Sequence, residues 1–118
     1  MISNQERKDI CAMMNAQAPR ENQPGQKFPR GSRVQVTKDM PNYMRHFASG
    51  FKAIVMYTYA QKFGGDDIDS YSLVKLNDSD EPIDRTAWYK ENQLTLIENP
   101  SEKGFQIIEQ ANEKFGKL

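Results

Sequence analysis

Hydrophobic and polar residues alternate along the middle of the chain in the pattern of short β-strands. Residues 33–37 alternate strictly, so that both of their valines face inward. Residues 51–60 are β-branched and aromatic throughout, and residues 70–76 form the next strand after a Gly-Gly turn. Residues 94–97 form a last short strand. The pattern predicts an antiparallel β structure at the centre of the chain.

The only tryptophan, Trp88, stands beside Tyr89 and just before a polar turn and the last strand. An aromatic plug, a tight turn and a final strand over the core are typical of a small barrel that closes on itself. We therefore expect one small barrel over residues 31–98.

Helical signals flank the predicted barrel on its N-terminal side. Ser3 and Glu6 have the spacing of a capping box, which predicts a helix over residues 3–17. Ile10, Met13, Met14 and Gln17 then share one narrow face. This face either packs on the chain's own barrel or is kept for a partner.

The end of the chain also predicts a helix. Asn99 is expected at its cap, Pro100 at its first position and Gly116 at its end. Gly104 lies inside it and should weaken it by about 1 kcal/mol relative to alanine. Because so short a helix needs tertiary contacts, three apolar side chains are expected to dock: Phe105, Ile108 and Phe115.

These signals divide the chain into four parts. Residues 1–18 form an N-terminal helix, and residues 19–30, which are rich in proline with almost nothing to bury, form an extended linker. Residues 31–98 form the barrel and residues 99–118 a C-terminal helix. The expected class is mainly β with flanking helices (α+β).

The order of these parts resembles the small Src-homology-3-like (SH3-like) barrels, including the KOW type. Shared features are a Gly-Ser turn, a Val-x-Val strand, a loop ending in Gly50, a long hydrophobic strand, a Gly-Gly turn, a further strand and then Trp88. This resemblance implies a five-stranded antiparallel barrel. It covers residues 31–98 and leaves both helices without a counterpart.

The chain also resembles a group of small bacteriophage-borne proteins with no agreed activity. The residues that carry this likeness are Met44-x-His46-Phe47, Gly50-Phe51-x-Ala53-Ile54-Val55, Gly64-Gly65, Tyr71-Ser72-Leu73 and Ala87-Trp88-Tyr89-x-Glu91-x-Gln93-Leu94. The likeness implies the fold and a phage origin more than a function.

Length and composition bear on the number of domains and on the compartment in which the protein acts. The 118 residues fit a single domain. No apolar run approaches the roughly 18 residues of a membrane span, and the polar start lacks a signal peptide. The single cysteine, Cys11, forms no internal disulfide. These features favour the cytoplasm of a cell or of an infected host.

The residue inventory argues against an enzyme. His46 is the only histidine, and no serine or cysteine stands in a nucleophile motif. Residues 66–69 bring carboxylates together after the Gly-Gly turn but lack the spacing of a calcium loop. We expect no catalytic residue, no metal and no cofactor.

Two features favour binding of a protein. Aromatic side chains can line a groove, as SH3 domains use them against proline-rich ligands; alternation places Tyr57 and Tyr59 on one strand face and Met56 and Thr58 on the other. The acidic stretch from Asp66 to Asp84 would steer a basic partner. The candidate protein-binding residues are Asp66, Asp67, Asp69, Tyr57, Tyr59, Tyr89, Met13 and Met14.

A basic and aromatic set favours nucleic acid instead. Its cations are Arg30, Arg33, Lys38, Arg45 and Lys52, with Tyr43, Phe47 and Phe51 among them. Cations bind phosphates and aromatic faces stack on bases. The chain has zero net charge, however, whereas nucleic-acid domains usually show a basic excess.

The sequence therefore favours a non-enzymatic binding module, phage-borne and directed at a host protein, which it would inhibit. One alternative is a KOW-like module that associates with nucleic acid. The other is a small assembly protein that associates with itself through its helices. The oligomeric state stays open.

Overall fold

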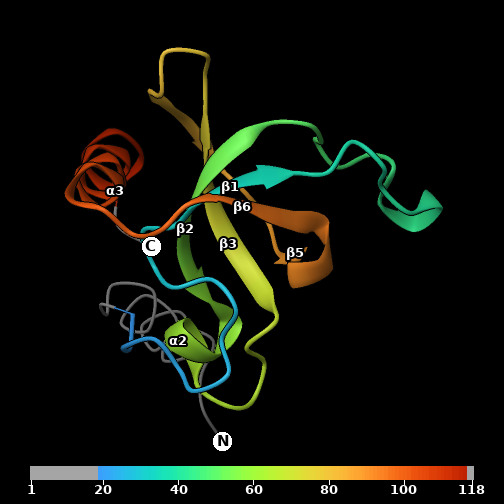
Figure 1. The fold of residues 1–118 in the computed structure, drawn as a ribbon, viewed down its shortest axis with the longest axis horizontal. Helices are drawn as coiled ribbons and strands as arrows, with labels where there is room; N and C mark the ends of the chain where they lie inside the picture. The colour runs from blue at the N-terminus through green and yellow to red at the C-terminus, as the bar shows by residue number, and fades with distance from the viewer. Residues whose placement is uncertain (1–18, 117–118) are drawn as a thin grey trace, which may run out of the picture.

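The strands form one antiparallel sheet with a helix across one face (Figure 1). The structure is a computed structural model that describes residues 19–116. Its strands are β1 (Arg33–Val36), β2 (Lys52–Thr58), β3 (Ser70–Leu76), β4 (Pro82–Arg85), β5 (Tyr89–Lys90) and β6 (Leu94–Glu98). The order across the sheet is β4-β3-β2-β1-β6, and β5 pairs separately with β3. The mainly β class is confirmed.

The predicted five-stranded closed barrel is wrong. The sheet has six strands, and the strands at its two ends, β4 and β6, do not pair with each other. The reason lies in residues 82–90, which divide into two short strands on the same edge of β3. Arg85 of β4 lies opposite Val74, whereas Lys90 of β5 lies opposite Ser70. Both β4 and β5 thus pair with the outer edge of β3, and the sheet stays open.

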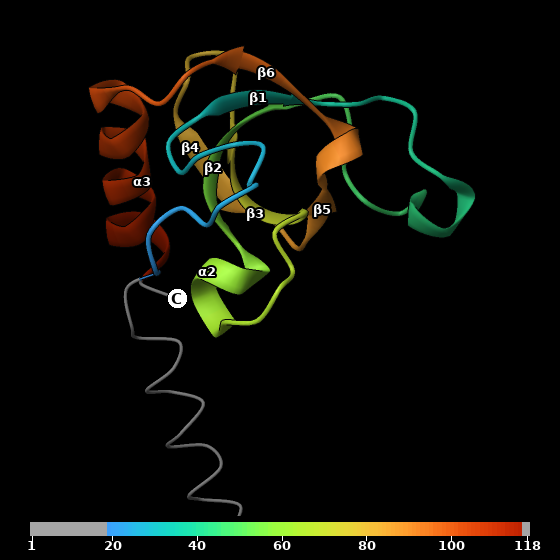
Figure 2. The same ribbon diagram turned by 60° about the horizontal axis from the view of Figure 1, so that its bottom comes forward.

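The sheet has an apolar cluster on each face. Val34 and Val36 are buried, as their alternation predicts, in a cluster that also contains Phe28, Phe51, Ala53, Val55, Tyr71, Leu73, Tyr89 and Leu94. The other cluster joins the sheet to the C-terminal helix and contains Ile54, Met56, Tyr57, Val74, Leu76, Ile107, Ile108 and Ala111. Figure 2 shows that helix, α3, standing beside the sheet.

A β-bulge in β2 changes which side chains share a face. The pairing of β2 with β3 shifts register between Val55 and Tyr57, and a bulge of this kind interrupts strict alternation. Met56 and Tyr57 therefore lie in the same cluster. The prediction that they occupy opposite faces is wrong.

The strand predicted over residues 51–60 ends early, because a helix begins inside it. Helix α2 (Tyr59–Phe63) follows Thr58, whose side chain accepts a hydrogen bond from the backbone N–H of Gln61. The Gln61 side chain in turn accepts from the backbone N–H of Thr58. These two bonds form a capping box, so Tyr59 belongs to a helix and not to a strand face.

Helix α3 (Glu102–Phe115) confirms a C-terminal helix but with a different cap. Ser101, not Asn99, accepts the capping hydrogen bond, from the backbone N–H of Gly104. Ile108 is buried in the cluster between the sheet and α3, as expected. Ile107 and Ala111 are buried there too, and Phe115 is half-buried against the same cluster. Phe105 lies outside this cluster: it is 44% exposed, and its ring lies against Gly31. The docked face is therefore rotated from the predicted one.

Residues 19–30 contain no helix or strand, yet they pack closely on the sheet. Phe28 is buried in the core, and its backbone N–H, like that of Lys27, donates to the Tyr71 hydroxyl oxygen at 3.1 Å. Nearer the start of the segment, the Arg20 backbone N–H donates to the Gln61 carbonyl. The expectation that this segment has almost nothing to bury is therefore wrong: Phe28 packs in the core and two backbone hydrogen bonds join the segment to Tyr71, a contact that we call the latch.

Two short 3-10 helices, η1 (Asn42–Met44) and η2 (Glu91–Gln93), complete the described elements. η1 lies in the loop over residues 38–50, which projects to the right of the sheet in Figure 1. The helix predicted over residues 3–17 lies outside the described residues.

Candidate binding surface

Four aromatic side chains meet at one end of the helix-covered face, and we call them the aromatic surface: Tyr57, Tyr59, Phe63 and Trp88. The ring centroids of Tyr59 and Phe63 are 4.9 Å apart, and those of Tyr59 and Trp88 are 5.3 Å apart. Trp88 also lies 5.9 Å from Tyr57 and 6.3 Å from Phe63. These spacings are in the range of favourable aromatic pairs.

Different elements position these rings. Tyr59 and Phe63 are four residues apart in α2, so they lie on the same side of that helix. Tyr57 is placed beside them by the bulge in β2. Trp88 comes from the short connection between β4 and β5, which crosses the edge of β3.

The aromatic surface is partly open to solvent. Tyr59 is 41% exposed and Phe63 is 36% exposed, whereas Tyr57 is buried and its ring packs against Trp88. Trp88 is half-buried against the cluster that joins the sheet to α3. Exposed aromatic rings supported from below by buried ones are typical of a contact surface for another molecule.

Two cations lie beside the aromatic surface. Lys62 Nζ is 5.7 Å from the Tyr57 ring centroid, within the range of a cation–π contact. Arg30 Nη1 donates to the Met56 carbonyl at 3.0 Å. Burial lowers the pKa of Arg30, and burial together with the Arg30 charge lowers the pKa of Lys62. None of the ion pairs found within residues 19–116 involves Arg30.

The acidic loop, residues 66–69, adjoins the first turn of α2. The Ala60 backbone N–H donates to the Asp67 carbonyl at 2.8 Å, which holds the loop against the helix. Asp67 Oδ1 accepts from the Ser70 backbone N–H, and Asp69 is 3.7 Å from Lys90 Nζ. The Asp66 side chain is exposed.

The pKa of Asp67 reflects these contacts. Burial alone would raise it, but hydrogen bonds with Asp69 and Ser70 and the Lys90 charge outweigh burial, so the pKa of Asp67 is lowered. These contacts therefore favour the charged form of Asp67. Among the described residues, no group of three or more His, Cys, Asp or Glu side chains is placed to hold a metal ion.

The other aromatic candidate, Tyr89, belongs to the core. It is buried, and its hydroxyl donates to the Ala48 carbonyl at 2.7 Å. Tyr71 is buried as well. Met13 and Met14 lie outside the described residues. The structure thus brings Tyr57, Tyr59 and the acidic loop together and places Tyr89 elsewhere.

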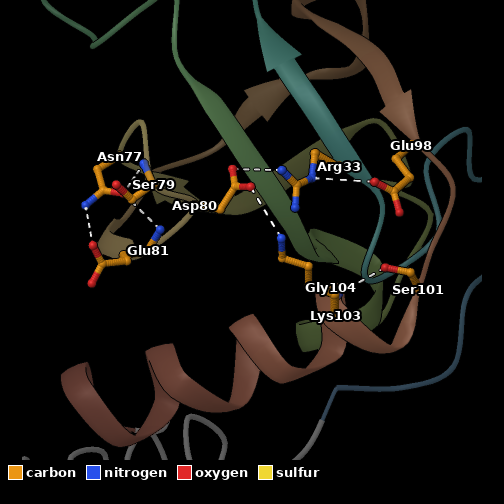
Figure 3. A network of polar contacts seen from close by, with 9 residues as sticks. All are labelled: Arg33, Asn77, Ser79, Asp80, Glu81, Glu98, Ser101, Lys103 and Gly104. Atoms are coloured by element: carbon orange, nitrogen blue, oxygen red, sulfur yellow. Dashed lines mark hydrogen bonds and ion pairs between the residues drawn. The ribbon is translucent and has the colours of Figure 1, made fainter.

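The basic set predicted for nucleic acid is divided. Arg33 is 2.8 Å from Asp80 and 3.9 Å from Glu98, and its side chain is only 13% exposed. Lys103 of α3 lies 3.5 Å from the second Asp80 oxygen. Figure 3 shows Asp80 between these two cations, so Arg33 serves the packing of α3 and the β3–β4 turn.

The remaining cations separate into two places. Arg30 lies beside the aromatic surface. Lys38 and Arg45 are exposed in the projecting loop, and Lys52 is exposed at the start of β2. Tyr43, in the projecting loop, is 80% exposed. The ring centroid of Phe47, in the same loop, is 5.9 Å from that of Tyr89.

Sequence reasoning missed Phe63 as a surface residue. The signal was present, because Thr58-x-x-Gln61 has the capping-box pattern and places Tyr59 and Phe63 at helical spacing. The β-branched and aromatic run up to Ala60 concealed this pattern by predicting a strand.

Comparison with protein-family models, with curated proteins and with solved structures gave no match for this chain. None of the helices among residues 19–116 is long and apolar enough to cross a membrane. The surface chemistry is therefore the basis for a functional proposal.

Proposed function

We propose that this protein is a non-enzymatic binding module that holds a segment of another protein on its aromatic surface. One observation carries the proposal: the partly exposed Tyr59 and Phe63 rings both pack against the half-buried Trp88, which in turn packs against the buried Tyr57. Aromatic side chains provide large contact areas at a small entropy cost.

The neighbouring charges favour one class of partner. The acidic loop adjoins α2, and two of its members, Asp66 and Asp69, are exposed; Asp69 pairs with Lys90, whereas Asp66 is available to a positive charge on a partner. The favoured partner is an extended apolar segment, rich in proline, that carries a basic residue. A ligand of this kind is also what the resemblance of the sequence to SH3-like barrels implies, because SH3 domains use aromatic side chains against proline-rich ligands.

The proposal includes the setting that the sequence indicates. The module is borne by a phage, acts in the host cytoplasm and inhibits a host protein by occupying its binding segment. The resemblance to phage-borne proteins supports this part, while the aromatic surface supports the binding itself.

A peptide titration tests the chemistry. A short proline-rich peptide with one arginine is added while the fluorescence of Trp88, the only tryptophan, is followed. The proposal expects saturable binding that weakens when the arginine is replaced by glutamate. Binding should also weaken at least tenfold in Tyr59→Ser/Phe63→Ser. Tyr43→Ser is the control, because it removes a still more exposed ring from the projecting loop. Equal binding by the double variant would contradict the proposal.

The projecting loop supports a second candidate function, association with nucleic acid. Lys38 and Arg45 are exposed there together with Tyr43, which is free to stack on a base, and Lys52 is exposed at the start of β2 just after the loop. This reading expects binding to mixed-sequence RNA or DNA that weakens steeply with salt. It also expects Lys38→Gln/Arg45→Gln/Lys52→Gln to lose that binding, while Tyr59→Ser/Phe63→Ser retains it.

A further inference from the structure

Two arginines line one open cavity beside the aromatic surface. The cavity has a volume of about 370 Å³, and its lining residues are Arg20, Glu21, Asn22, Arg30, Gln61 and Phe105. It lies where the segment over residues 19–30 passes between α2 and the first turn of α3 (Figure 2). Its volume is in the range of sites for small ligands.

Arg30 brings a half-buried charge to this cavity. Its Nη1 donates to the Met56 carbonyl at 3.0 Å, and this is the one hydrogen bond of its side chain found within residues 19–116. No ion pair in that part of the chain involves it. Because a guanidinium group has five N–H donors, most of the Arg30 donors are left for another partner. Burial of an unpaired cation is costly, and a bound anion would offset that cost.

The buried Gln61 side chain fixes the backbone that carries both arginines. Gln61 Nε2 donates to the Arg20 carbonyl at 2.9 Å and to Asn22 Oδ1 at 3.4 Å. The Arg30 backbone N–H also donates to Asn22 Oδ1, at 2.9 Å. No bond of the Asn22 Nδ2 group is found among the described residues, so that group can donate to a ligand. The cavity is therefore largely formed before a ligand binds, which lowers the cost of binding.

The Arg20 side chain is the second cation of the cavity. It is exposed, and its guanidinium group lies beside the end of α2, since a Cβ added at Gly64 would lie 3.5 Å from Arg20 Nη2. In the described part of the chain this group makes no ion pair. Two guanidinium groups without a paired carboxylate thus meet at one cavity.

This set of donors suits a phosphate group better than a carboxylate. One arginine already satisfies both oxygens of a carboxylate, whereas a phosphate group has three oxygens that accept from several donors at once. Guanidinium groups are also well matched to phosphate geometry. The cavity exceeds the size of a phosphate ion, and the Phe105 ring, 44% exposed, gives it an apolar wall. It therefore has room for the organic part of a phosphate monoester.

Carboxylates near the two arginines oppose the binding of an anion. Glu21 lines the same cavity, and Glu109 and Glu113 of α3 line a second cavity to which Arg30 also contributes. Within residues 19–116 none of the three forms an ion pair with either arginine. Their charges repel an anion, so removal of Glu21 should strengthen its binding. The site thus has a signature opposite in sign to removal of the arginines.

We infer that Arg20, Asn22 and Arg30 form a binding site for a phosphate group, supplied by a small phosphate monoester or by free phosphate. The two guanidinium groups and the Asn22 amide donate to the phosphate oxygens, and Phe105 contacts the organic part. This site goes beyond the proposed peptide binding and does not depend on it.

Titration of the isotope-labelled full chain with ribose 5-phosphate at constant ionic strength tests this site by NMR. The signals of the Arg30 Nε–H and of the Asn22 side-chain amide should shift saturably. Arg20→Gln and Arg30→Gln should each weaken binding by about tenfold, whereas Glu21→Gln should strengthen it severalfold. Arg45→Gln is the matched control, because it removes an exposed arginine from the projecting loop and should leave the affinity unchanged.

A second titration, with inorganic phosphate, distinguishes the two sources of the group. Tighter binding of ribose 5-phosphate assigns an organic phosphate, and equal affinity assigns free phosphate. Arg30→Gln also loses the bond to the Met56 carbonyl, so the melting temperature of each variant is measured without ligand. If Arg30→Gln does not fold, the exposed Arg20→Gln decides the test.

Four results would overturn the inference. They are the absence of a saturable shift with both compounds, an unchanged affinity in Arg20→Gln, an equal loss of affinity in Arg45→Gln, and equally tight binding of acetate. The third would show that the anion responds to the net charge of the chain and not to the cavity. The fourth would contradict the preference for phosphate over a carboxylate.

Discussion

At the residue scale, the Tyr71 hydroxyl is the clearest single determinant of how the N-terminal part of the described chain packs. It accepts the backbone N–H groups of Lys27 and Phe28, and burial raises the pKa of Tyr71. Tyr71→Phe leaves two amides without their acceptor, which costs about 1–3 kcal/mol. Urea unfolding should show this loss, and the exposed Tyr43→Phe should show none. An unchanged unfolding midpoint for Tyr71→Phe would contradict the latch.

Gly104 gives a prediction in which helix propensity and packing oppose each other. Propensity favours alanine there by about 1 kcal/mol. An added Cβ, however, would meet the Gly31 carbonyl oxygen, so α3 would have to move away from the backbone turn beneath it. We expect Gly104→Ala to be destabilising by about 1–3 kcal/mol, while Gln106→Ala on the exposed face stays within about 0.5 kcal/mol. A stabilised Gly104→Ala would show that propensity dominates.

Single residues were predictable where local pattern alone decides their burial. Val34 and Val36 are buried because β1 is regular and central. Phe105 was expected in the core but lies outside it, because the backbone of α3 approaches Gly31 at Gly104 and the Phe105 ring lies against Gly31. That approach is a tertiary contact, and no local sequence pattern contains it.

At the scale of elements, α2 positions the aromatic surface through its capping box. Thr58→Ala removes the cap and should cost about 1 kcal/mol in the free energy of unfolding. Because α2 carries Tyr59 and Phe63, acrylamide should also quench Trp88 more readily. Ser101→Ala removes the corresponding cap of α3 at a similar cost and should leave the quenching unchanged. Equal quenching in the two variants would contradict this role of α2.

The turn between β3 and β4 joins three elements through Asp80. Hydrogen bonding to Arg33 and the charges of Arg33 and Lys103 lower the pKa of Asp80 below its ordinary value of 3.8. A carboxylate with a lowered pKa in the folded state stabilises the fold above its ordinary pKa. That contribution is lost as pH falls through the lowered value.

Asp80→Asn should therefore reduce stability near neutral pH and flatten its decline below about pH 4. Asparagine is the appropriate substitution, because Asp80 has a φ of 60° and asparagine tolerates that conformation. Thermal melts at several pH values measure the effect, with Asp78→Asn, in the same turn, as the control. Parallel pH curves for wild type and Asp80→Asn would contradict it.

Element positions were largely predictable, whereas their pairing was less so. β3 occupies the predicted residues 70–76 because its alternation and flanking turns agree. β2 departs from its prediction because a bulge and a capping box act within five residues of each other. Both features depend on hydrogen bonds that compete with strand pairing.

At the scale of the whole molecule, the aromatic surface is assembled from parts far apart in sequence. Tyr57 and Phe63 lie in the middle of the chain, and Trp88 follows β4. Arg30 belongs to the N-terminal segment that the Tyr71 hydroxyl holds against the sheet. The sequence indicated aromatic and acidic candidates but not their grouping. The grouping follows from the open sheet, in which β4 and β5 share the edge of β3 and leave Trp88 over α2.

The most direct test of the central claim is capture of a partner from nuclease-treated bacterial lysate by the full chain and two surface variants. The account predicts one protein that is retained by the wild-type chain and Tyr43→Ser and lost by Tyr59→Ser/Phe63→Ser, with equal melting temperatures for all three. Retention by the double variant, or recovery that depends on intact nucleic acid, would contradict the claim that the aromatic surface binds a protein.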